Sequence, residues 1–455
     1  MSYLLKSATV LTLDAPAVER ADLRVAEGRV IERGPVLEPR EDEEVIDLSD
    51  RLVMPGRVCA HTHLYSSLAR GMTAPPRAPK NFKEILELIW WRLDRALDEE
   101  TIYWSAMAGA MDAARAGTTC LFDHHSSPSH ITGSLQIVRE AIEKIGLRAV
   151  LCYEVTDRGG AKERDAGIEE NRSFLNWSRG DVQSPLFRPM VGAHASFTLS
   201  DESLDACAGL MREFDAGIHI HVAEDLCDVA DTQAKYRSGV VERLAKHEAL
   251  NNRTILAHGI HLSDEDIAIA RSTGAWFAHN PRSNMNNQVG YAPVTKFGER
   301  VVLGTDGIGA DMFEEARFAF LKSRDASLGA QASRPHGDQT QQSEHAGRVR
   351  PQGADDWLRV LANNQRLASE AFGADLTTLT PGSAADLIVL DYKSPTPLTT
   401  ENIAWHLAFG MNSASVESVM VNGRFLIRDR VHSLGDEVYV RSREAASLLW
   451  AKLDS

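Results

Sequence analysis

The chain has 455 residues, a formal net charge of −15 and 43% hydrophobic residues, a balance typical of one large globular domain with a smaller one. The acidic charge excludes a nucleic-acid-binding protein, because such proteins carry a basic patch, and no stretch reaches the roughly 18 uncharged apolar residues that cross a membrane. The N-terminus lacks the pattern of a signal peptide. Five scattered cysteines indicate reduced thiols and a cytoplasmic location.

Both ends of the chain alternate apolar and polar residues with the period of two that is typical of β-strands. This pattern covers residues 8–14, 21–34, 43–49, 384–392 and 418–431. Asn422-Gly423 is a strong hairpin signal inside the last range. We therefore expect both termini to build one small β-sandwich, from residues 1–54 and from residues 376–455, the second part including a C-terminal helix.

Between these ends, short apolar segments alternate with amphipathic helical stretches such as 81–98 and 100–117, which predicts a parallel sheet of βα units. The predicted strands are 56–61, 118–123, 147–153, 188–194, 216–221, 253–258, 274–279 and 300–306. Eight such units predict an α/β fold, a (β/α)₈ TIM barrel over residues 55–375. Residues 332–353 are almost devoid of apolar side chains and are expected to form a mobile loop after the eighth strand.

Seven of the eight predicted strands end in His or Asp, at the end of the barrel where active sites lie. His61 and His63 are two residues apart, so their imidazoles point to the same side of the first strand. His221 ends the fifth strand and Asp306 the eighth, and a barrel brings both to the same rim. These four residues are a complete ligand set for a catalytic metal ion with a position left for water.

Two further residues are candidates for chemistry beside this metal ion. Glu224 follows His221 by three residues, and a carboxylate near the metal carries protons between water and substrate; the alternative is a solvated loop glutamate. His258 ends the sixth strand and suits hydrogen bonding to the attacking water, polarisation of a substrate oxygen, or metal binding. A structural histidine is the alternative there.

Candidates for substrate contact are the polar and aromatic side chains near the predicted rim: Tyr65, Trp90, His125, Glu154, Arg158 and His194. We expect His194 to contact the substrate and Trp90 to stack on a flat ring, with core packing as the alternative for the tryptophan. Glu154 and Arg158 follow the third strand and suit the polar edges of a ring, although a plain salt bridge in a turn has the same pattern.

Five motifs in this order, H-T-H after "MPG", then "HVAE", "LAHG", "AHNPRSNMN" and "LGTDG", resemble the amidohydrolase superfamily. The most similar branch is that of the mononuclear aminohydrolases and chlorohydrolases, which includes guanine deaminases, adenosylhomocysteine deaminases and triazine hydrolases. The resemblance covers nearly the whole chain. It implies one Zn²⁺ (sometimes Fe²⁺) at His61, His63, His221 and Asp306, with Glu224 as the acid/base residue and His258 as an orienting residue. No lysine ends the fourth strand, where binuclear relatives carry a carboxylated one, so two metal ions are not expected.

Together these observations predict a metal-dependent hydrolase that deaminates an amino-substituted N-heterocycle, purine-, pterin- or triazine-like, by attack of metal-bound hydroxide. Glu224 protonates a ring nitrogen, Asp306 passes a proton to the departing ammonia, and His258 stabilises the tetrahedral oxygen. One alternative is that the same site hydrolyses another C–N or C–Cl bond, as in triazine dechlorination, loss of an alkylamine or opening of a cyclic amide. A second alternative is a non-catalytic metal-binding scaffold. The expected partner is a small heterocyclic substrate, and the resemblance implies a homo-oligomer.

Overall fold

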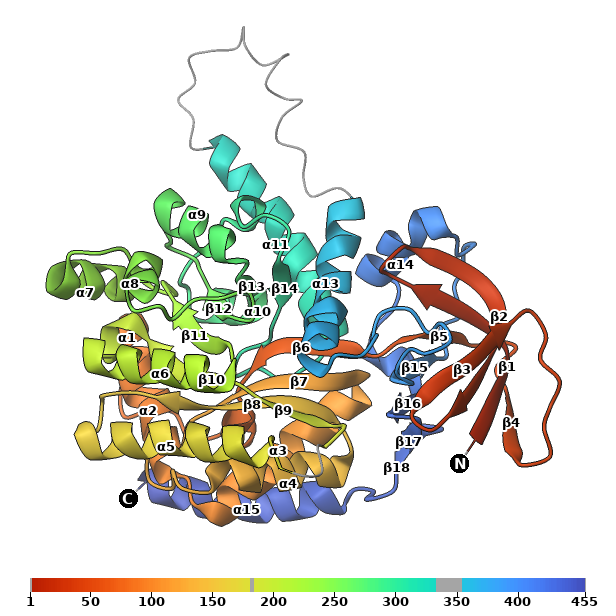
Figure 1. Ribbon diagram of the computed structural model, residues 1–455, viewed down its shortest axis with the longest axis horizontal. Coiled ribbons are helices and arrows are strands. Elements are labelled where there is room, and N and C mark those ends of the chain that lie inside the picture. Colours follow the sequence, from red (N-terminus) through yellow and green to blue (C-terminus); the bar gives the residue numbers. More distant parts are fainter. Residues whose placement is uncertain (1, 181–183, 333–353, 455) are drawn as a thin grey trace, which may run out of the picture.

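The computed structural model describes residues 2–180, 184–332 and 354–454, which form a helix-covered barrel and a sheet made from both termini (Figure 1). Apart from its first residue, the loop predicted over 332–353 falls outside these ranges. Among the described helices, none combines the length and the apolar character needed to cross a membrane.

The barrel is built from eight parallel strands, hydrogen-bonded in chain order: β6 (Arg57–Thr62), β7 (Thr118–His125), β8 (Arg148–Val155), β10 (Val191–Ala195), β11 (Ile218–Val222), β12 (Ile255–His258), β13 (Trp276–His279) and β14 (Val301–Leu303). Each overlaps one predicted segment. The ring closes where the backbone N–H groups of Thr305 and Asp306 donate to the carbonyl of His61 at 2.8 and 3.0 Å. The predicted TIM-like barrel is confirmed. A short extra strand, β9 (Phe187–Pro189), pairs with β8.

The outer helices follow the strands around the barrel: α3 (Glu99–Arg115), α4 (Ser134–Ile145), α5 (Ala161–Trp177), α6 (Asp201–Phe214), α7 (Leu226–Tyr236), α8 (Val240–Lys246), α9 (Asp264–Thr273), α11 (Met312–Ala332) and α13 (Ala354–Phe372). The helix predicted over 100–117 is α3. It begins after Asp98, whose carboxylate accepts from the N–H of Thr101 at 2.9 Å while the threonine hydroxyl accepts from the N–H of Asp98 at 2.8 Å, a capping box.

The helix predicted over 81–98 is instead three short pieces. They are α1 (Phe82–Ile85), the π-helical segment η2 (Leu86–Trp90) and α2 (Trp91–Ala96). The backbone hydrogen bonds of a π-helical segment span one residue more than those of an α-helix, and such segments are frequent at functional sites. Further short helices over the carboxyl end of the strands are η1 (Leu64–Ala69), η3 (Ser196–Thr198), α10 (Pro281–Asn286) and η4 (Val294–Lys296).

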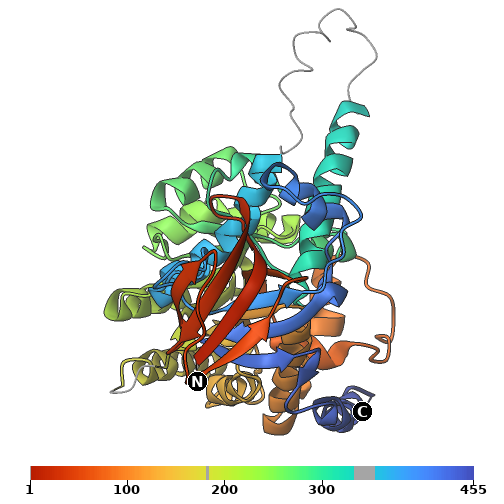
Figure 2. The ribbon, with the colours of Figure 1, turned by 90° about the vertical axis from the view of Figure 1, so that its right-hand side faces the viewer.

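Both termini contribute to the second sheet, whose strands are β1 (Ser2–Thr12), β2 (Ala17–Ala26), β3 (Arg29–Gly34), β4 (Glu43–Asp47), β5 (Leu52–Pro55), β15 (Leu387–Leu390), β16 (Val416–Val421), β17 (Arg424–Arg428) and β18 (Val431–His432). The order is β18-β17-β16-β15-β5-β1-β2-β3, with β4 on β1. β5 pairs antiparallel with β15, so the first and last parts of the chain share one sheet. Figure 2 looks at this side of the molecule and shows strands of both ends side by side.

The terminal β-domain is thus confirmed, and its strands form one curled sheet rather than two separate ones. The rings of Tyr3 on β1 and Phe425 on β17 contact each other at 5.2 Å, although three strands lie between β1 and β17 in the sheet order. The curl encloses an apolar core of its own. Asn422 and Gly423, both with positive φ, turn the predicted hairpin between β16 and β17.

The C-terminal part also supplies η5 (Thr400–Asn402), α14 (Ile403–Phe409), η6 (Ser413–Ser415) and the predicted terminal helix, α15 (Glu437–Asp454). This last helix leaves the sheet and runs along the barrel beside α3 (Figure 1). It is tied there by Trp450, whose indole N–H donates to the carbonyl of Leu68 at 2.8 Å. The domain boundaries at 54/55 and 375/376 stay predictions.

Candidate metal centre and active site

Four predicted metal ligands meet at the carboxyl end of the barrel strands. The ligand atoms of His61, His63, His221 and Asp306 all lie within 4.8 Å of one another. The Nε2 atoms of His63 and His221 are 3.2 Å apart, and Oδ1 of Asp306 is 3.0 Å from Nε2 of His63 and 3.6 Å from Nε2 of His61. Three imidazoles and one carboxylate therefore converge on one point, as a mononuclear metal site requires.

Hydrogen bonds from behind hold each imidazole in this orientation. Nδ1 of His63 is 2.6 Å from the carbonyl of His124, and Nδ1 of His221 is 2.8 Å from the carbonyl of His194. Nδ1 of His61 lies 2.9 Å from Nε2 of His219. Because a carbonyl only accepts, Nδ1 of His63 and of His221 carries the proton, and each Nε2 keeps its lone pair for a cation.

Two inward-facing imidazole nitrogens, one in this cluster and one beside it, have no hydrogen-bond partner among the described residues. Nε2 of His61 and Nε2 of His258 are buried without a hydrogen bond among the described residues, which is costly unless a ligand satisfies them. His258 and Asp306 also have φ values of 71° and 55°, and such strained backbone clusters at functional sites. The donor set, its orientation and its unsatisfied nitrogens all fit a divalent cation.

Glu224 and His258 lie beside the cluster, as their positions in the sequence predicted. Oε2 of Glu224 is 3.5 Å from Nε2 of His258, and the two form a second close group with Asp306. Burial, followed by the charge of Asp306, raises the pKa of Glu224 well above its usual value. Burial acts on Asp306 in the same sense, but the adjacent imidazoles of His61 and His63 hold the pKa of Asp306 well below its usual value. The pKa values of these two neighbouring carboxyl groups are thus shifted in opposite directions.

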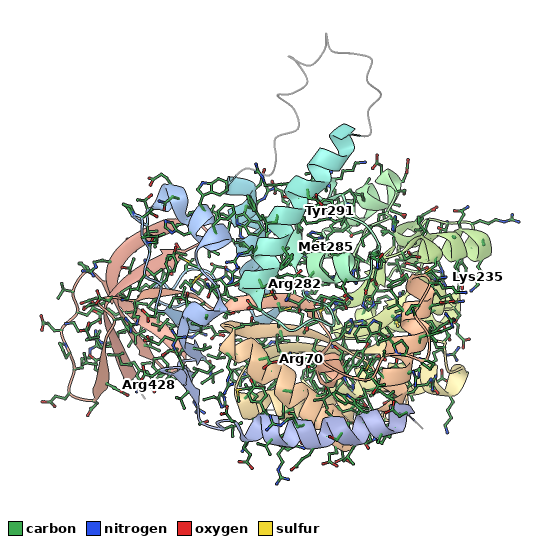
Figure 3. All side chains as sticks on the ribbon, turned by 180° about the vertical axis from the view of Figure 1, so that it is seen from behind. Arg70, Lys235, Arg282, Met285, Tyr291 and Arg428 are labelled. Atoms are coloured by element: carbon green, nitrogen blue, oxygen red, sulfur yellow. The ribbon has the colours of Figure 1, made fainter. Side chains whose placement is uncertain are left out.

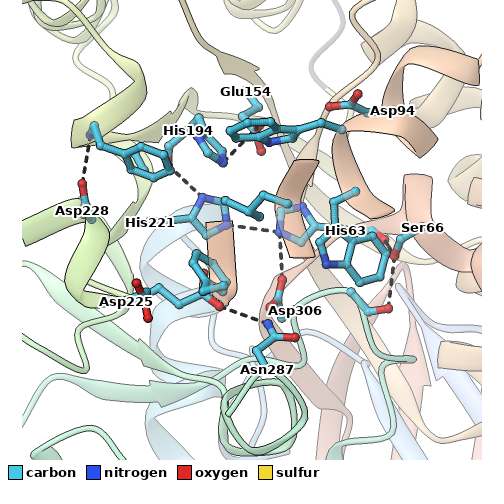
Figure 4. A pocket seen from close by; sticks show the side chains of 18 of the residues that line it. His63, Ser66, Asp94, Glu154, His194, His221, Asp225, Asp228, Asn287 and Asp306 are labelled. Carbon is cyan, nitrogen blue, oxygen red and sulfur yellow. Dashed lines mark hydrogen bonds and ion pairs between the residues drawn. The ribbon is translucent and has the colours of Figure 1, made fainter. Parts of the chain in front are cut away.

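A pocket opens from this cluster toward η2 and the loops after β8 and β10 (Figure 4). Four of the six predicted substrate contacts line it: Tyr65, Trp90, Glu154 and His194. Phe82, Trp91 and Phe197 complete its aromatic wall. His63 and His221 lie at its centre, with Glu154 on one side of them and Asp306 and Asn287 on the other (Figure 4).

The other two predicted contacts, His125 and Arg158, do not line the pocket. His125 is fully buried on β7, and its Nε2 is 3.0 Å from the hydroxyl of Ser127. Arg158 lies behind the wall, where its guanidinium pairs with Asp94 at 2.6 Å and covers the ring of Trp91. Both positions correct the expectation of direct substrate contact. Arg158 instead forms a salt bridge, which was the alternative interpretation, because its side chain points toward Asp94 on α2 and not into the pocket.

The sequence reasoning missed several residues around the site. His219 points at His61, and its signal was present, because it precedes His221 by two residues and so faces the same side of β11. Asn287, whose amide donates to Glu224 at 3.2 Å, and Asp94 had no such signal. Ser283, on the helix after β13, donates a hydrogen bond from its hydroxyl to Oδ2 of Asp306.

The helix α10 carries Ser283 and is held in place from outside. Arg282 forms a buried ion pair with Glu315 and a second pair with Glu314 of α11, and its guanidinium donates to the carbonyl of Gly309 at 2.8 Å. Figure 3 shows this arginine from behind, next to α11. The orientation of Asp306 thus depends on a second layer of contacts.

The sequence pattern of the amidohydrolase family matches residues 52–338. The chain belongs to the amidohydrolase family. This amidohydrolase is 28% identical over 435 residues to a 5'-deoxyadenosine deaminase of Methanothermobacter thermautotrophicus, with 94% of each chain covered. It is 29% identical over 434 residues to a 5-methylthioadenosine/S-adenosylhomocysteine deaminase of Thermococcus sibiricus, again with 94% of each chain covered.

Solved structures share its fold. An adenosine deaminase from Xanthomonas campestris with bound zinc superposes with a TM-score of 0.81 at 21% identity, covering 98% of both chains. The atrazine chlorohydrolase of Arthrobacter aurescens TC1, complexed with zinc, gives a TM-score of 0.80 at 20% identity, covering 98% of this chain and 100% of the other. The predicted family and architecture of this amidohydrolase are therefore confirmed.

Proposed function

We propose that this amidohydrolase removes an amino group from an N-heterocycle and releases ammonia. The observation that supports this best is one juxtaposition. The metal-ligand group of His61, His63, His221 and Asp306 adjoins the group of Glu224, His258 and Asp306, and they share the aspartate. A hydrolase of this kind needs a site for a cation with a proton carrier next to it.

The cofactor that we propose is one Zn²⁺ per chain, with Fe²⁺ as the alternative, because imidazole and carboxylate ligands suit both ions. When bound, such a cation lowers the pKa of water toward neutrality and so supplies a nucleophile. Glu224, whose pKa is raised by burial and by the charge of Asp306, donates a proton to the ring nitrogen next to the attacked carbon. Asp306 takes up the proton of the nucleophile and passes it to the leaving ammonia. His258 donates a hydrogen bond to the oxygen that develops negative charge.

The pocket supports a flat aromatic substrate. Its walls include Phe82, Trp90, Trp91 and Phe197, and aromatic side chains stack on planar rings. The names of the two relatives concern adenosine-derived compounds, which supports a ring of purine type.

The test is a screen for ammonia release from purines, pterins, pyrimidines and triazines by the metal-reconstituted protein, with zinc and iron measured in the same sample. We expect Glu224→Gln to keep its metal and to lose about 10²- to 10⁴-fold in kcat, the usual contribution of a positioned acid or base. The matched control is Glu248→Gln, whose side chain is 74% exposed and pairs with Arg212 at the surface.

The outcomes separate the alternatives. Near-normal kcat in Glu224→Gln would refute the role of this residue. Chloride release from atrazine without ammonia release from any amine would favour the chlorohydrolase alternative. Metal binding without either product would favour the scaffold.

A homo-oligomer in the cytoplasm is part of this proposal. In support, α11 and α14 carry exposed apolar side chains: Phe318, Leu321, Trp405 and Phe409. Exposed apolar groups of this kind mark protein contacts. All five cysteines are free thiols, which suits a reducing compartment. Size-exclusion chromatography with light scattering tests the oligomer.

A further inference from the structure

Glu154 is a buried carboxylate that the protein itself only partly satisfies. It lies near the end of β8, its side chain is 4% exposed, and it lines the pocket. His124 Nδ1 is 3.2 Å from Oε2, and Oε1 lies 3.9 Å from a nitrogen of Arg158 and from Nε2 of His194, too far for a hydrogen bond. Arg158 instead binds Asp94 at 2.6 Å. No described residue donates a hydrogen bond to Oε1. A carboxylate oxygen of this kind, on a residue that lines the pocket, is placed for a donor that enters the pocket.

The charge of Glu154 is well defined. Burial alone raises its pKa, but His194, His124 and Arg158 together hold the pKa of this carboxyl at about 2. The geometry agrees, because nitrogens of His124, His194 and Arg158 surround the carboxylate at 3.2–3.9 Å, and a carboxylate in such surroundings accepts hydrogen bonds.

Glu154 lies close to the proposed metal ligands. A carboxylate oxygen of Glu154 lies within 4.8 Å of a ring nitrogen of His63, and one lies within the same distance of a ring nitrogen of His221. Glu224 adjoins the opposite part of the cluster, next to His258 and Asp306. Figure 4 shows His63 and His221 between Glu154 on one side and Asp306 on the other. A ring carbon held at the cluster therefore has one carboxyl group on each side.

The attacked carbon has two neighbouring ring atoms, one facing Glu224 and the other facing Glu154. The two carboxyl groups require different kinds of atom at these positions. The neighbour facing Glu224 must be an unprotonated nitrogen, since it receives a proton in the proposed deamination. The neighbour facing Glu154 must carry hydrogen, since Glu154 only accepts. A ring nitrogen without hydrogen at this position would place its lone pair against the carboxylate of Glu154. A ring carbon at this position would offer the carboxylate no hydrogen bond.

We propose that Glu154 determines substrate specificity by accepting a hydrogen bond from a ring N–H next to the attacked carbon. This inference rests on the proposed deamination and narrows its substrate class to 2-amino-4-oxopyrimidine rings, as in guanine, pterin and isocytosine. In these rings the amino carbon lies between an imine-type nitrogen and a lactam N–H. In adenine and cytosine the amino carbon lies between a nitrogen and a carbon, and in the aminotriazines between two aprotic nitrogens.

Two pairs of rings, which differ in the ring atoms next to the amino carbon, test this with the metal-loaded full chain. Ammonia release is compared for isocytosine against cytosine and for guanine against adenine, in the wild type, in Glu154→Gln and in the control Glu163→Gln. Glu163 lies on α5, outside the pocket lining, and pairs with Arg95 at 3.0 Å. We expect the wild type and the control to prefer isocytosine and guanine, in which the amino carbon adjoins a ring N–H. Glu154→Gln should lose about 10- to 100-fold in kcat/KM for these two rings, mostly through KM, the effect of one charge-assisted hydrogen bond.

Equilibrium dialysis of the same rings with the same three proteins gives a second readout, and the zinc content of each variant is measured to show an intact site. Faster deamination of adenine, cytosine or adenosine-type nucleosides would overturn the role of Glu154 while upholding deamination. An unchanged preference in Glu154→Gln would also overturn it. If no ring releases ammonia, the proposed deamination is wrong, and the role of Glu154 is then judged from dialysis alone. Equal binding of isocytosine and cytosine would contradict that role. Tighter binding of isocytosine that is lost in Glu154→Gln would support it.

Discussion

The rim of the barrel and its junction with the terminal sheet both bury charged groups, but they treat them differently. At the junction, Arg148 of β8 forms two buried hydrogen bonds with Asp386, at 2.6 and 2.9 Å. At the rim, the Nε2 atoms of His61 and His258 have no partner among the described residues. Buried polar groups are normally paired, so the junction is a structural contact, whereas the rim is organised around a ligand. The following predictions test this difference.

The largest effect is expected where a ligand to the cation is removed. His221→Ala leaves three of the four ligands and should lose the metal and at least about 10³-fold in activity, because catalysis depends on the ion. Metal analysis and ammonia release measure both losses. The control is His247→Ala, since His247 pairs with Asp205 at the surface, at 2.7 Å. Full metal content in His221→Ala would show that the cluster is not the metal site.

Removal of a charge at the junction should affect stability instead. Asp386→Asn leaves the guanidinium of Arg148 buried without a countercharge, and breaking a buried pair costs about 3–5 kcal/mol in the free energy of unfolding. Urea denaturation measures this loss, and the folded variant should keep wild-type kcat. Asp436→Asn, in an exposed pair with Arg115, is the control and should change stability by less than about 1 kcal/mol. Loss of activity at unchanged stability would contradict the structural assignment.

The sequence was sufficient for the barrel and the metal ligands for a physical reason. Parallel strands buried on both faces are continuous apolar runs, so their ends are easy to locate, and the period of two shows that His61 and His63 share a side. The same rule applies to His219 and His221, but only the residue that ends the strand was considered. The β-domain was also predictable, whereas its curl into one sheet depends on the pairing of β5 with β15, which no local pattern encodes.

The substrate pocket was less predictable, because it depends on side-chain direction and on tertiary contacts. His124 and His125 are adjacent on β7 and face opposite sides of it, and nothing local distinguishes them. Arg158 follows a strand as Glu154 does, yet it turns back to Asp94 on α2. The π-helical segment that carries Trp90 is invisible in a pattern that reads as one helix.

Burial of the Asp123 carboxyl group near the rim affects the stability of the folded protein in a way that depends on pH. Oδ1 of Asp123 accepts from the N–H of Leu64 at 2.7 Å, while Oδ2 is buried and has no partner in the described part of the chain. Burial raises the pKa of Asp123 to about 7. Since the folded pKa lies above the unfolded value, the stability that this group contributes is complete below about pH 4 and is lost as the pH rises through 7. Asp123→Asn keeps the acceptor and should be more stable than the wild type at pH 8, by up to about 4 kcal/mol.

Denaturation of both proteins at pH 4.5 and pH 8 measures this difference, which should shrink at the lower pH. An equal advantage at both values would mean that the substitution acts through packing and not through the charge. At the junction, where the carboxylate is paired, Asp386→Asn should give no such gain at pH 8.

The smallest effect is expected one layer behind the metal site. Ser283→Ala removes the hydroxyl that donates to Oδ2 of Asp306 and should lower activity or metal affinity about 10- to 100-fold, as loss of a ligand-orienting hydrogen bond does. Stability should hardly change, since the serine contributes little apolar area. Ser272→Ala on the exposed face of α9 is the matched control. If Ser283→Ala has wild-type activity and metal affinity, His61 and His63 suffice to orient Asp306. The metal site would then depend less on the contacts of α10 than the geometry of this helix indicates.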